Sequence, residues 1–165
     1  MKVSSVLAKD IIKIRKDASL LDAVKLLFKN QVSSLLVIND DDQLVGYLSE
    51  KDIYRALHPD YRDYYSHPEA YLDYEAMEIK AQQIQNFPVW KFMNDRVICI
   101  SEDDPLMKVG AIMLAKHINR LPVLSKEGKL VGIVSRRELY HKIFDRVFQE
   151  QKDGKNVNVD EYVNV

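Results

Sequence analysis

The sequence lacks the features that identify several large classes of protein. Its 165 residues include one cysteine, Cys99, which excludes an internal disulfide framework and a cysteine-rich zinc site. No apolar run approaches the ~20 residues of a membrane-spanning helix, and residues 1–5 lack the basic start of a signal peptide. The 24 basic and 25 acidic residues leave no positive excess for general binding to nucleic acid or membrane surfaces. We therefore expect a soluble, cytoplasmic α/β protein that does not contact membranes.

Motifs of common enzymes are also missing. The chain has no G-x-x-x-x-G-K-(S/T) phosphate loop and no G-x-G-x-x-G dinucleotide fingerprint. Cys99 lies between two isoleucines in a segment that reads as the middle of a strand, where a thiol is usually buried and inert. The histidines have no partners at metal-ligand spacing. We expect no enzymatic activity, no catalytic residues and no metal site.

The chain does contain an internal duplication. Shifting the sequence by 86 positions aligns residues 12–54 with residues 98–140 without a gap, and 11 of the 43 pairs are identical. The identical pairs include Gly46 with Gly132 and Ser49 with Ser135. Apolar residues make up 47% of the chain, so two packed copies can bury a substantial core.

Each copy predicts the element order strand, helix, strand, strand, helix. The first strand is expected at residues 12–14 and 97–100, from alternating or continuous apolar residues. Ser19 followed by Asp22 resembles a capping box that starts the first helix. In the second copy Asp104 is expected to cap a helix that has Pro105 at its first position.

The second half of each copy predicts a hairpin and a closing helix. Strands are expected at residues 35–38 and 44–48, with their counterparts in the second copy. The polar segment 39–43 reads as the hairpin turn, and its counterpart, residues 125–129, carries a glycine. The closing helices are expected at residues 51–57 and 137–151. The predicted fold class is α/β (α+β), with two pseudo-twofold-related repeats packed sheet to sheet and a cleft on each side.

Four segments are expected along the chain. Residues 1–57 form the first repeat, residues 58–90 a tyrosine-rich linker with a helix, residues 91–151 the second repeat and residues 152–165 a polar, frayed or loosely docked tail. The linker helix, expected at residues 69–85, carries an apolar stripe. That stripe consists of Ala70, Tyr74, Met77, Ala81 and Ile84. It either packs on its own domain or forms a dimer or partner surface.

Two motifs point to a known family. The first copy reads G-Y-L-S-E-K-D at residues 46–52, and the second reads G-I-V-S-R-R-E at residues 132–138, after N-R-L-P-V-L at residues 119–124. Their pattern, a glycine, an apolar pair, a serine and an acid three residues later, resembles the cystathionine β-synthase (CBS) domain. The resemblance covers residues 3–57 and 90–148. Glu138 departs from the family's aspartate.

The resemblance implies a fold and a regulatory function. CBS domains work as tandem pairs, often dimerise into four-domain discs, and bind adenosine compounds in the clefts between their sheets. The resemblance thus implies a sensor of AMP, ADP or ATP, or of S-adenosylmethionine, that requires no cofactor. It also implies a homodimer and leaves room for a further protein partner.

The residues expected to bind the ligand follow from the same resemblance. A carboxylate can accept hydrogen bonds from both ribose hydroxyls, a serine hydroxyl can donate to phosphate, and helix-start amides favour anions. The adenine slot is expected from residues in the leading strand of each copy and on the facing strands. The expected ligand-binding residues are Ile11, Ile12, Leu36, Ser49, Asp52, Val97, Ile98, Arg120, Pro122, Ser135, Arg136, Arg137 and Glu138.

Other interpretations of these residues stay open. The serines can be plain helix N-caps, and the carboxylates can be first-turn acids that favour the helix dipole. Arg136 and Arg137 can form a solvated face, and His117 can interact with the dipole at the end of a helix. Two functions remain as alternatives: a dimeric interaction module with unoccupied clefts, and a nucleic-acid binder that uses the arginines, which the net charge of −1 disfavours.

Overall fold

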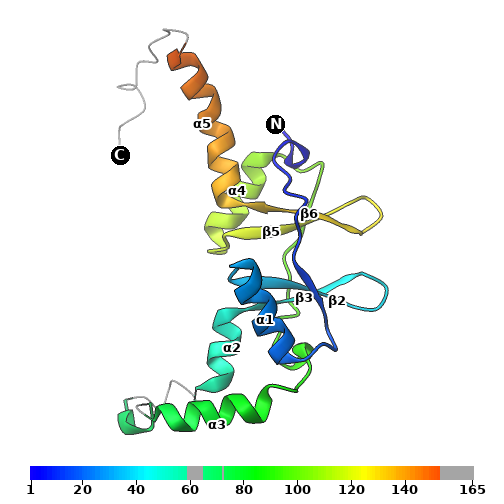
Figure 1. Cartoon of the computed structure of the whole chain (residues 1–165). Coiled ribbons are helices and arrows are strands. Elements are labelled where there is room, and N and C mark those ends of the chain that lie inside the picture. The colour runs from blue at the N-terminus through cyan, green and yellow to red at the C-terminus, as the bar shows by residue number, and fades with distance from the viewer. Residues whose placement is uncertain (59–64, 72, 153–165) are drawn as a thin grey trace. The chain divides into compact units, whose positions relative to one another are not determined.

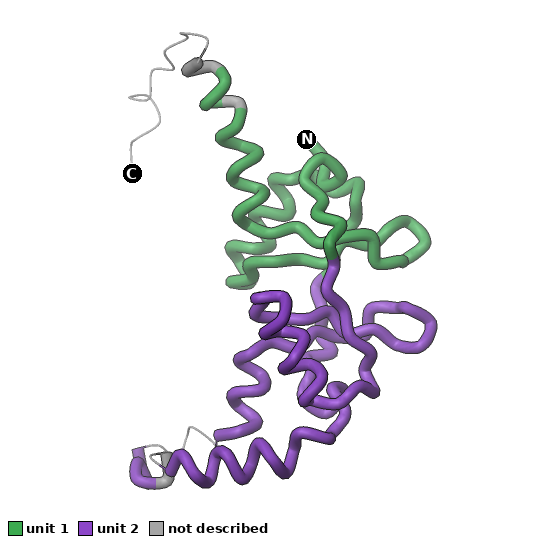
Figure 2. Tube along the Cα trace, viewed as in Figure 1, with its two compact units in different colours: residues 1–10, 99–165 green, residues 11–98 purple. Residues whose placement is uncertain are grey.

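The chain folds into two compact units that do not follow the simple order of the sequence. A computed structural model describes residues 1–58, 65–71 and 73–152. Unit 2 comprises residues 11–98, whereas unit 1 combines residues 1–10 with residues from 99 onward (Figure 2). Unit 2 holds the first repeat and unit 1 holds the second. The sequence interpretation of residues 152–165 as a polar tail falls outside the described residues, except for Lys152.

Unit 2 contains a three-stranded sheet in the order β1-β2-β3, of which Figure 1 labels β2 and β3. β1 runs parallel to β2, and β2 runs antiparallel to β3. The elements are β1 (Lys13–Arg15), α1 (Leu20–Asn30), β2 (Ser34–Ile38), β3 (Leu44–Ser49), α2 (Glu50–Leu57) and α3 (Tyr74–Ile84).

Unit 1 repeats this topology in the order β4-β5-β6, with the same parallel and antiparallel pairings. The hairpin register is also shared, because Val37 faces Gly46 and Val123 faces Gly132, each just before an irregularity in the ladder. Its elements are β4 (Ile100–Ser101), α4 (Leu106–Ala115), β5 (Arg120–Leu124), β6 (Leu130–Ser135) and α5 (Arg136–Lys152). The predicted α+β class and the order of elements are confirmed in both repeats.

The first strand of the second copy is shorter than the sequence predicts. An alternating apolar run suggested residues 97–100, but β4 contains only Ile100 and Ser101. Ile100 and Ser101 pair with β5, opposite Val123 and Leu124. Apolar periodicity shows which residues can be buried, but it does not set where the ladder of strand hydrogen bonds begins. Cys99 therefore precedes the strand and does not lie in its middle.

The start of α4 also differs from the prediction. Pro105 is the N-cap, and the helix begins one residue later at Leu106. The carboxylate of Asp104 instead accepts the N–H of Ser101 at 2.9 Å and pairs with Lys108 at 2.7 Å. Both contacts lower the pKa of Asp104, with the hydrogen bond from Lys108 the larger cause. The predicted cap is wrong because this carboxylate is already used by the preceding turn and by the lysine.

The core of unit 2 includes residues from beyond the first repeat. Helix α1 contributes residues spaced three and four positions apart, which lie on one helix face. The sheet adds alternating residues from its inner face, and the segment after α2 adds two more. The buried cluster consists of Ile14, Leu20, Ala23, Leu27, Leu35, Val37, Leu48, Ile84 and Val89.

The linker helix is only partly buried. α3 begins after Asp73, whose carboxylate accepts a first-turn amide at 2.9 Å, and not at residue 69 as predicted. Along the predicted stripe Ile84 is buried and Met77 is half-buried, whereas Tyr74 is 71% exposed. The C-terminal end of α3 therefore packs into the core of unit 2, whereas its N-terminal end leaves Tyr74 in solvent.

The first ten residues belong to unit 1, although the sequence assigned residues 1–57 to a single repeat. Val3 is fully buried, and its N–H donates to the carbonyl of Asp104 at 3.0 Å. Ala8 exchanges two backbone hydrogen bonds with Ile133 of β6, at 3.0 and 3.1 Å. These contacts pair backbone groups at the edge of β6 and bury an apolar side chain, which explains why the segment lies with the distant repeat.

Residues 87–98 pair with the first sheet, within unit 2, in the same way that residues 1–10 pair with the second sheet. Val89 is fully buried and donates its N–H to the carbonyl of Ala18 at 2.9 Å. Asn94 exchanges hydrogen bonds with Tyr47 of β3, at 2.8 and 3.0 Å. At the 86-residue shift Val89 matches Val3 and Asn94 matches Ala8. Their partners match as well, because Ala18 corresponds to Asp104 and Tyr47 to Ile133. We call residues 1–10 and 87–98 the leading segments, and the duplication includes them.

Glycines allow the leading segments to approach the sheets. A Cβ on Gly132 would lie 2.8 Å from the carbonyl oxygen of Ala8, which is closer than Cβ atoms come in practice. A Cβ on Gly46 would lie 3.0 Å from the carbonyl oxygen of Asn94. Side-chain atoms of Leu7 and Met93 lie closer still to the two added Cβ positions, but these side chains can shift. The backbone carbonyls cannot, so a side chain at either glycine would require the leading segment to move.

We predict that Gly132→Ala lowers the free energy of unfolding by about 1–3 kcal/mol, because an added methyl overpacks this contact. Gly110→Ala is the matched control. Its Cβ would lie 3.6 Å from Leu139, an ordinary contact, and alanine favours helix by about 1 kcal/mol over glycine. Urea denaturation should therefore show opposite signs for the two variants. Equal effects would contradict the close approach.

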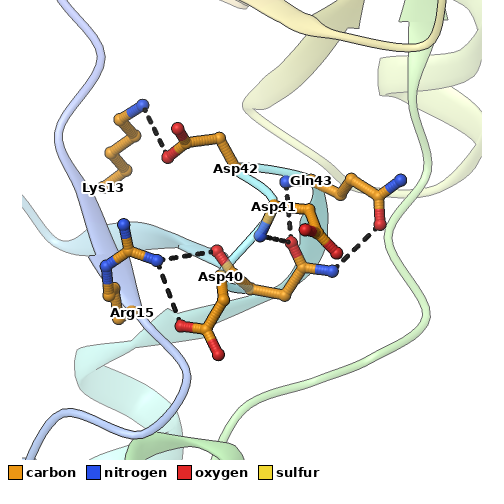
Figure 3. Close-up of polar contacts among 7 residues, drawn as sticks. Lys13, Arg15, Asp40, Asp41, Asp42 and Gln43 are labelled. Carbon is orange, nitrogen blue, oxygen red and sulfur yellow. Dashed lines mark hydrogen bonds and ion pairs between the residues drawn. The ribbon is translucent and has the colours of Figure 1, made fainter.

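Charged side chains connect the β2–β3 turn to β1 (Figure 3). The side-chain oxygen of Asn39 accepts two amides of the turn at 3.0 and 2.9 Å. Arg15 donates to the carbonyl of Asn39 at 3.1 Å and pairs with Asp40 at 3.2 Å. Lys13 lies 3.6 Å from Asp42. These ion pairs are exposed, so each contributes about 1 kcal/mol or less, and the turn's shape depends mainly on Asn39.

The two helices that follow the first strands end in the same way. Gln31 after α1 has φ 52°, and His117 after α4 has φ 53°, both in the left-handed region. This conformation commonly ends helices but is strained for residues with a Cβ. The sequence interpretation of His117 as a dipole partner therefore missed its backbone role.

We predict that His117→Gly stabilises the protein by about 1 kcal/mol, because glycine adopts a left-handed backbone without strain. His117→Ala separates this backbone effect from the loss of the imidazole, since alanine keeps the strain. Thermal unfolding should show a higher midpoint for the glycine variant only. A rise with alanine as well would contradict the explanation.

Candidate functional site

Each sheet passes directly from its last strand into a helix, and most of the predicted polar site residues lie at these two junctions. β3 ends at Ser49 where α2 begins, and β6 ends at Ser135 where α5 begins. Serine at the last strand position supplies an N-cap, and an acid three residues later completes a capping box. The same local sequence therefore ends the strand and starts the helix in both copies.

At the first junction the predicted ligand-binding groups bond to each other. The carboxylate of Asp52 accepts the backbone N–H of Ser49 at 2.9 Å and also accepts its hydroxyl. In return the N–H of Asp52 donates to the hydroxyl oxygen of Ser49 at 3.3 Å. The N–H of Glu50 donates to the carbonyl of Ser33 at 3.0 Å. The carboxylate uses one oxygen, Oδ2, for these contacts. Its other oxygen has no hydrogen-bond partner within the described ranges.

The second junction has the same box with a longer acid. The carboxylate of Glu138 accepts the N–H of Ser135 at 2.8 Å, and the N–H of Glu138 donates to the Ser135 hydroxyl at 3.2 Å. Among the described residues no bond forms here between the hydroxyl and the carboxylate. The N–H of Arg136 donates to the carbonyl of Asn119 at 2.8 Å. Glu138 is one methylene longer than an aspartate, yet it forms the same backbone cap as Asp52 does.

Charge distinguishes the two junctions. Arg120 begins β5 directly opposite Ser135 in the ladder, so the structure brings it beside the start of α5. Arg136 and Arg137 follow in the first turn, and all three arginines are exposed. The corresponding positions of the first copy hold Ser34, Glu50 and Lys51. The second junction is therefore the better environment for an anion.

The predicted apolar residues of the first copy lie close together in unit 2. Ile11 and Ile12 precede β1 and are half-buried, and the carbonyl of Ile12 accepts the N–H of Leu36 at 3.3 Å. Leu36 is buried on β2 opposite Lys13. Ile11, Ile12 and Leu36 therefore provide apolar side chains beside the parallel strands β1 and β2.

The corresponding residues of the second copy are divided between the units. Val97 and Ile98 are half-buried at the end of unit 2, whereas Pro122 is buried on β5 in unit 1. Sequence reasoning treated them as a single set because it aligned the repeats without the leading segments. Those segments were missed because their partners lie in the other repeat. The signal that could have found them is the extension of the 86-residue shift upstream, to Val3 with Val89.

Cys99 is the one thiol of the sequence and lies outside the two junctions. Burial raises the pKa of the Cys99 thiol, which disfavours the nucleophilic thiolate. Within the described ranges, no three His, Cys, Asp or Glu side chains gather in a way that could hold a metal ion. None of the helices described there is long and apolar enough to cross a bilayer.

We predict that Ser49→Ala lowers the free energy of unfolding by about 1 kcal/mol without any ligand, because α2 loses its N-cap. Ser33→Ala is the control, since this exposed loop serine contributes only its carbonyl to the junction. Chemical denaturation compares the two. A neutral result for Ser49→Ala would show that the capping box does not stabilise the helix.

The sequence matches one family model twice. The model of the CBS domain matches residues 3–59 and 88–145, which are the two repeats with their leading segments. An uncharacterised protein from Methanocaldococcus jannaschii is 32% identical over 150 residues, covering 84% of this chain and 89% of that protein. The inosine-5'-monophosphate dehydrogenase of the same organism is 24% identical over 138 residues, but the match covers only 23% of that enzyme.

Solved structures share the fold. The CBS-pair protein CBSX2 from Arabidopsis thaliana superposes with a TM-score of 0.72 at 21% identity, covering 89% of this chain and 96% of that chain. A crystal structure of CBSX2 in complex with AMP gives a TM-score of 0.66 at 22% identity, covering 88% and 98% of the respective chains.

Proposed function

The chain belongs to the CBS domain family, with two copies in tandem, and we propose that it is a regulatory module that binds an adenosine nucleotide. The observation that carries this proposal is the pair of matched strand-to-helix junctions, each with a serine and a carboxylate in the same register. The AMP complex of the structurally similar CBSX2 supports the choice of ligand class. The match to the inosine-5'-monophosphate dehydrogenase covers only 23% of that enzyme, so most of the enzyme has no counterpart in this chain, which supports a regulatory role without catalysis.

The ligand groups proposed at each junction follow from hydrogen-bonding chemistry. The free Oδ1 of Asp52 accepts a ribose hydroxyl, while Oδ2 keeps the cap. The hydroxyl of Ser49 turns from the carboxylate to a phosphate oxygen, so binding exchanges one hydrogen bond for another. Arg120, Arg136 and Arg137 supply positive charge for phosphates in the second junction. Ile11, Ile12, Leu36, Val97, Ile98 and Pro122 supply apolar surface for adenine.

A regulatory module of this kind acts through differential affinity. A ligand shifts a conformational equilibrium only by the free energy with which it prefers one state. AMP, ADP, ATP and S-adenosylmethionine share the adenosyl group, so the module would report energy or metabolite levels and needs no resident cofactor. A cytoplasmic location belongs to this proposal and fits a chain with a single free cysteine.

We also propose that the chain forms a homodimer through its helices. Both repeats expose large apolar side chains at matched positions, and repeated exposure at one register favours a shared interface. The pairs are Leu21 with Met107, Phe28 with Leu114, and Tyr54 with Tyr140. A dimeric interaction module with unoccupied nucleotide sites is the second candidate function, favoured by this same exposure.

We predict that millimolar AMP, ADP or ATP raises the melting temperature by about 2–4 °C, since a ligand at 100 times its Kd adds about 2.7 kcal/mol. S-adenosylmethionine, NADH and a short RNA complete the panel. A melt unmoved by all nucleotides would leave the interaction module as the function, and a shift with RNA alone would favour nucleic-acid binding.

We predict that Asp52→Ala weakens nucleotide binding about ten- to hundredfold, because a charged hydrogen-bond acceptor is lost. Glu138→Ala should do less, since its longer side chain fits the ribose less well. Asp22→Ala removes an equivalent first-turn acid from α1 and is the control. Calorimetry that ranks Glu138→Ala as more damaging would show that the arginine-rich junction dominates.

We predict that Phe28→Ser combined with Leu114→Ser converts a dimer into a monomer of 19.2 kDa with little change in melting temperature, because both side chains are exposed in the single chain at 77% and 67%. Sedimentation at micromolar concentration measures the mass. A wild-type chain that already sediments as a monomer would contradict the dimer.

A further inference from the structure

Helix α5 continues well beyond the point where its counterpart ends. α2 has 8 residues and α5 has 17, so residues 144–152 extend past the positions that match α2. Leu139 near the start of α5 is buried and contacts α4 at Gly110. The later part of the helix therefore has a surface that the fold of the repeat does not explain.

The extension carries an exposed apolar stripe. Tyr140, Phe144 and Phe148 follow one another at intervals of four residues, which places them on one helix face. They are 47%, 48% and 54% exposed, and Ile143 beside them is 43% exposed. The rings of Phe144 and Phe148 lie 6.2 Å apart. We call these four residues the α5 stripe.

The chain itself supplies a segment that suits this stripe. Thirteen residues follow α5, and from residue 157 they read V-N-V-D-E-Y-V-N-V. Every second residue from Val157 to Val165 is valine except Glu161, so an extended segment would present four valines and this one acid on the same side. Apart from Glu161, the alternation is typical of a segment that buries one face.

Length and charge agree with docking onto the same helix. Thirteen extended residues span at most about 43–47 Å. The distance back along α5 from Lys152 to Tyr140 is only about 18 Å, at 1.5 Å for each helical residue. The sequence of α5 contains five basic and three acidic residues, whereas residues 153–165 contain three acidic residues and one basic residue. The two segments therefore attract each other.

We propose that residues 157–165 of the same chain dock along the α5 stripe and cover it. Direct attachment to the helix gives the segment a high effective concentration, so a weak contact suffices. The stripe shares Tyr140 with the proposed dimer positions, but Ile143, Phe144 and Phe148 are not among those positions and none of the four is a proposed ligand-binding residue. Docking and nucleotide binding can therefore fail or succeed separately, and a mixed sample distinguishes docking from a contact between two copies.

Paramagnetic relaxation tests the contact directly. A nitroxide on Asn164→Cys, in a Cys99→Ser background, should strongly reduce the amide signals of Phe144 and Phe148 in the ¹⁵N spectrum. Adding Phe144→Ser and Phe148→Ser should abolish the effect, whereas Leu114→Ser on α4 should leave it unchanged. Unreduced signals, or a reduction that survives the double serine variant, would overturn the proposal.

A mixed sample separates the chain's own segment from that of a second copy. Spin-labelled ¹⁴N protein is mixed with unlabelled ¹⁵N protein, and in this sample the α5 signals should stay intact. Signal loss here, at the level seen in the singly labelled sample, would show that another copy covers the stripe and would overturn the intramolecular contact.

Limited proteolysis measures the same docking without a cysteine. Trypsin cleavage after Lys155 should be about tenfold faster in the Phe144→Ser, Phe148→Ser variant than in the natural chain, a factor that corresponds to about 1.4 kcal/mol of lost docking. Leu114→Ser should again match the natural chain. Equal cleavage rates in all three proteins would overturn the proposal.

Discussion

The close passage of a leading segment over a glycine is the constraint on which each unit depends. Ala8 and Asn94 pair with β6 and β3 at positions where a Cβ would meet their own backbone. This pairing buries Val3 and Val89, and it fixes the sheet edge next to the strand-to-helix junctions. The junction geometry that we propose for nucleotide binding therefore depends on residues that lie far away in sequence.

The local parts of the fold were predictable because their signals are local. Apolar periodicity located the helices and hairpins, and Ser19 and Ser49 marked helix starts that the structure confirms. The leading segments were not predicted, because nothing in residues 1–10 specifies a partner more than 90 positions away. The role of Asp104 was misjudged because a cap, a turn and a lysine compete for one carboxylate, and spacing alone does not rank them.

The candidate site was located by the sequence but not described by it. The motif placed Ser49 and Asp52 at one junction, and the structure adds that these two groups already bond each other. The ligand that we propose for this junction would therefore compete with an internal hydrogen bond between Ser49 and Asp52, which lowers its affinity. The Ser135 hydroxyl is not engaged in this way by Glu138, so the two sites differ in more than charge.

The membership of residues 1–10 in unit 1 affects the order in which the protein assembles on the ribosome. Unit 2 is continuous in sequence, so it is complete once residue 98 has emerged, and domains generally fold as they are synthesised. Residues 1–10 are made before unit 2 but must wait for β6, about 130 residues later, before their hydrogen bonds can form. Until then Val3 and Leu7 lack their native cover, so the placement of residues 1–10 depends on the synthesis of the second repeat.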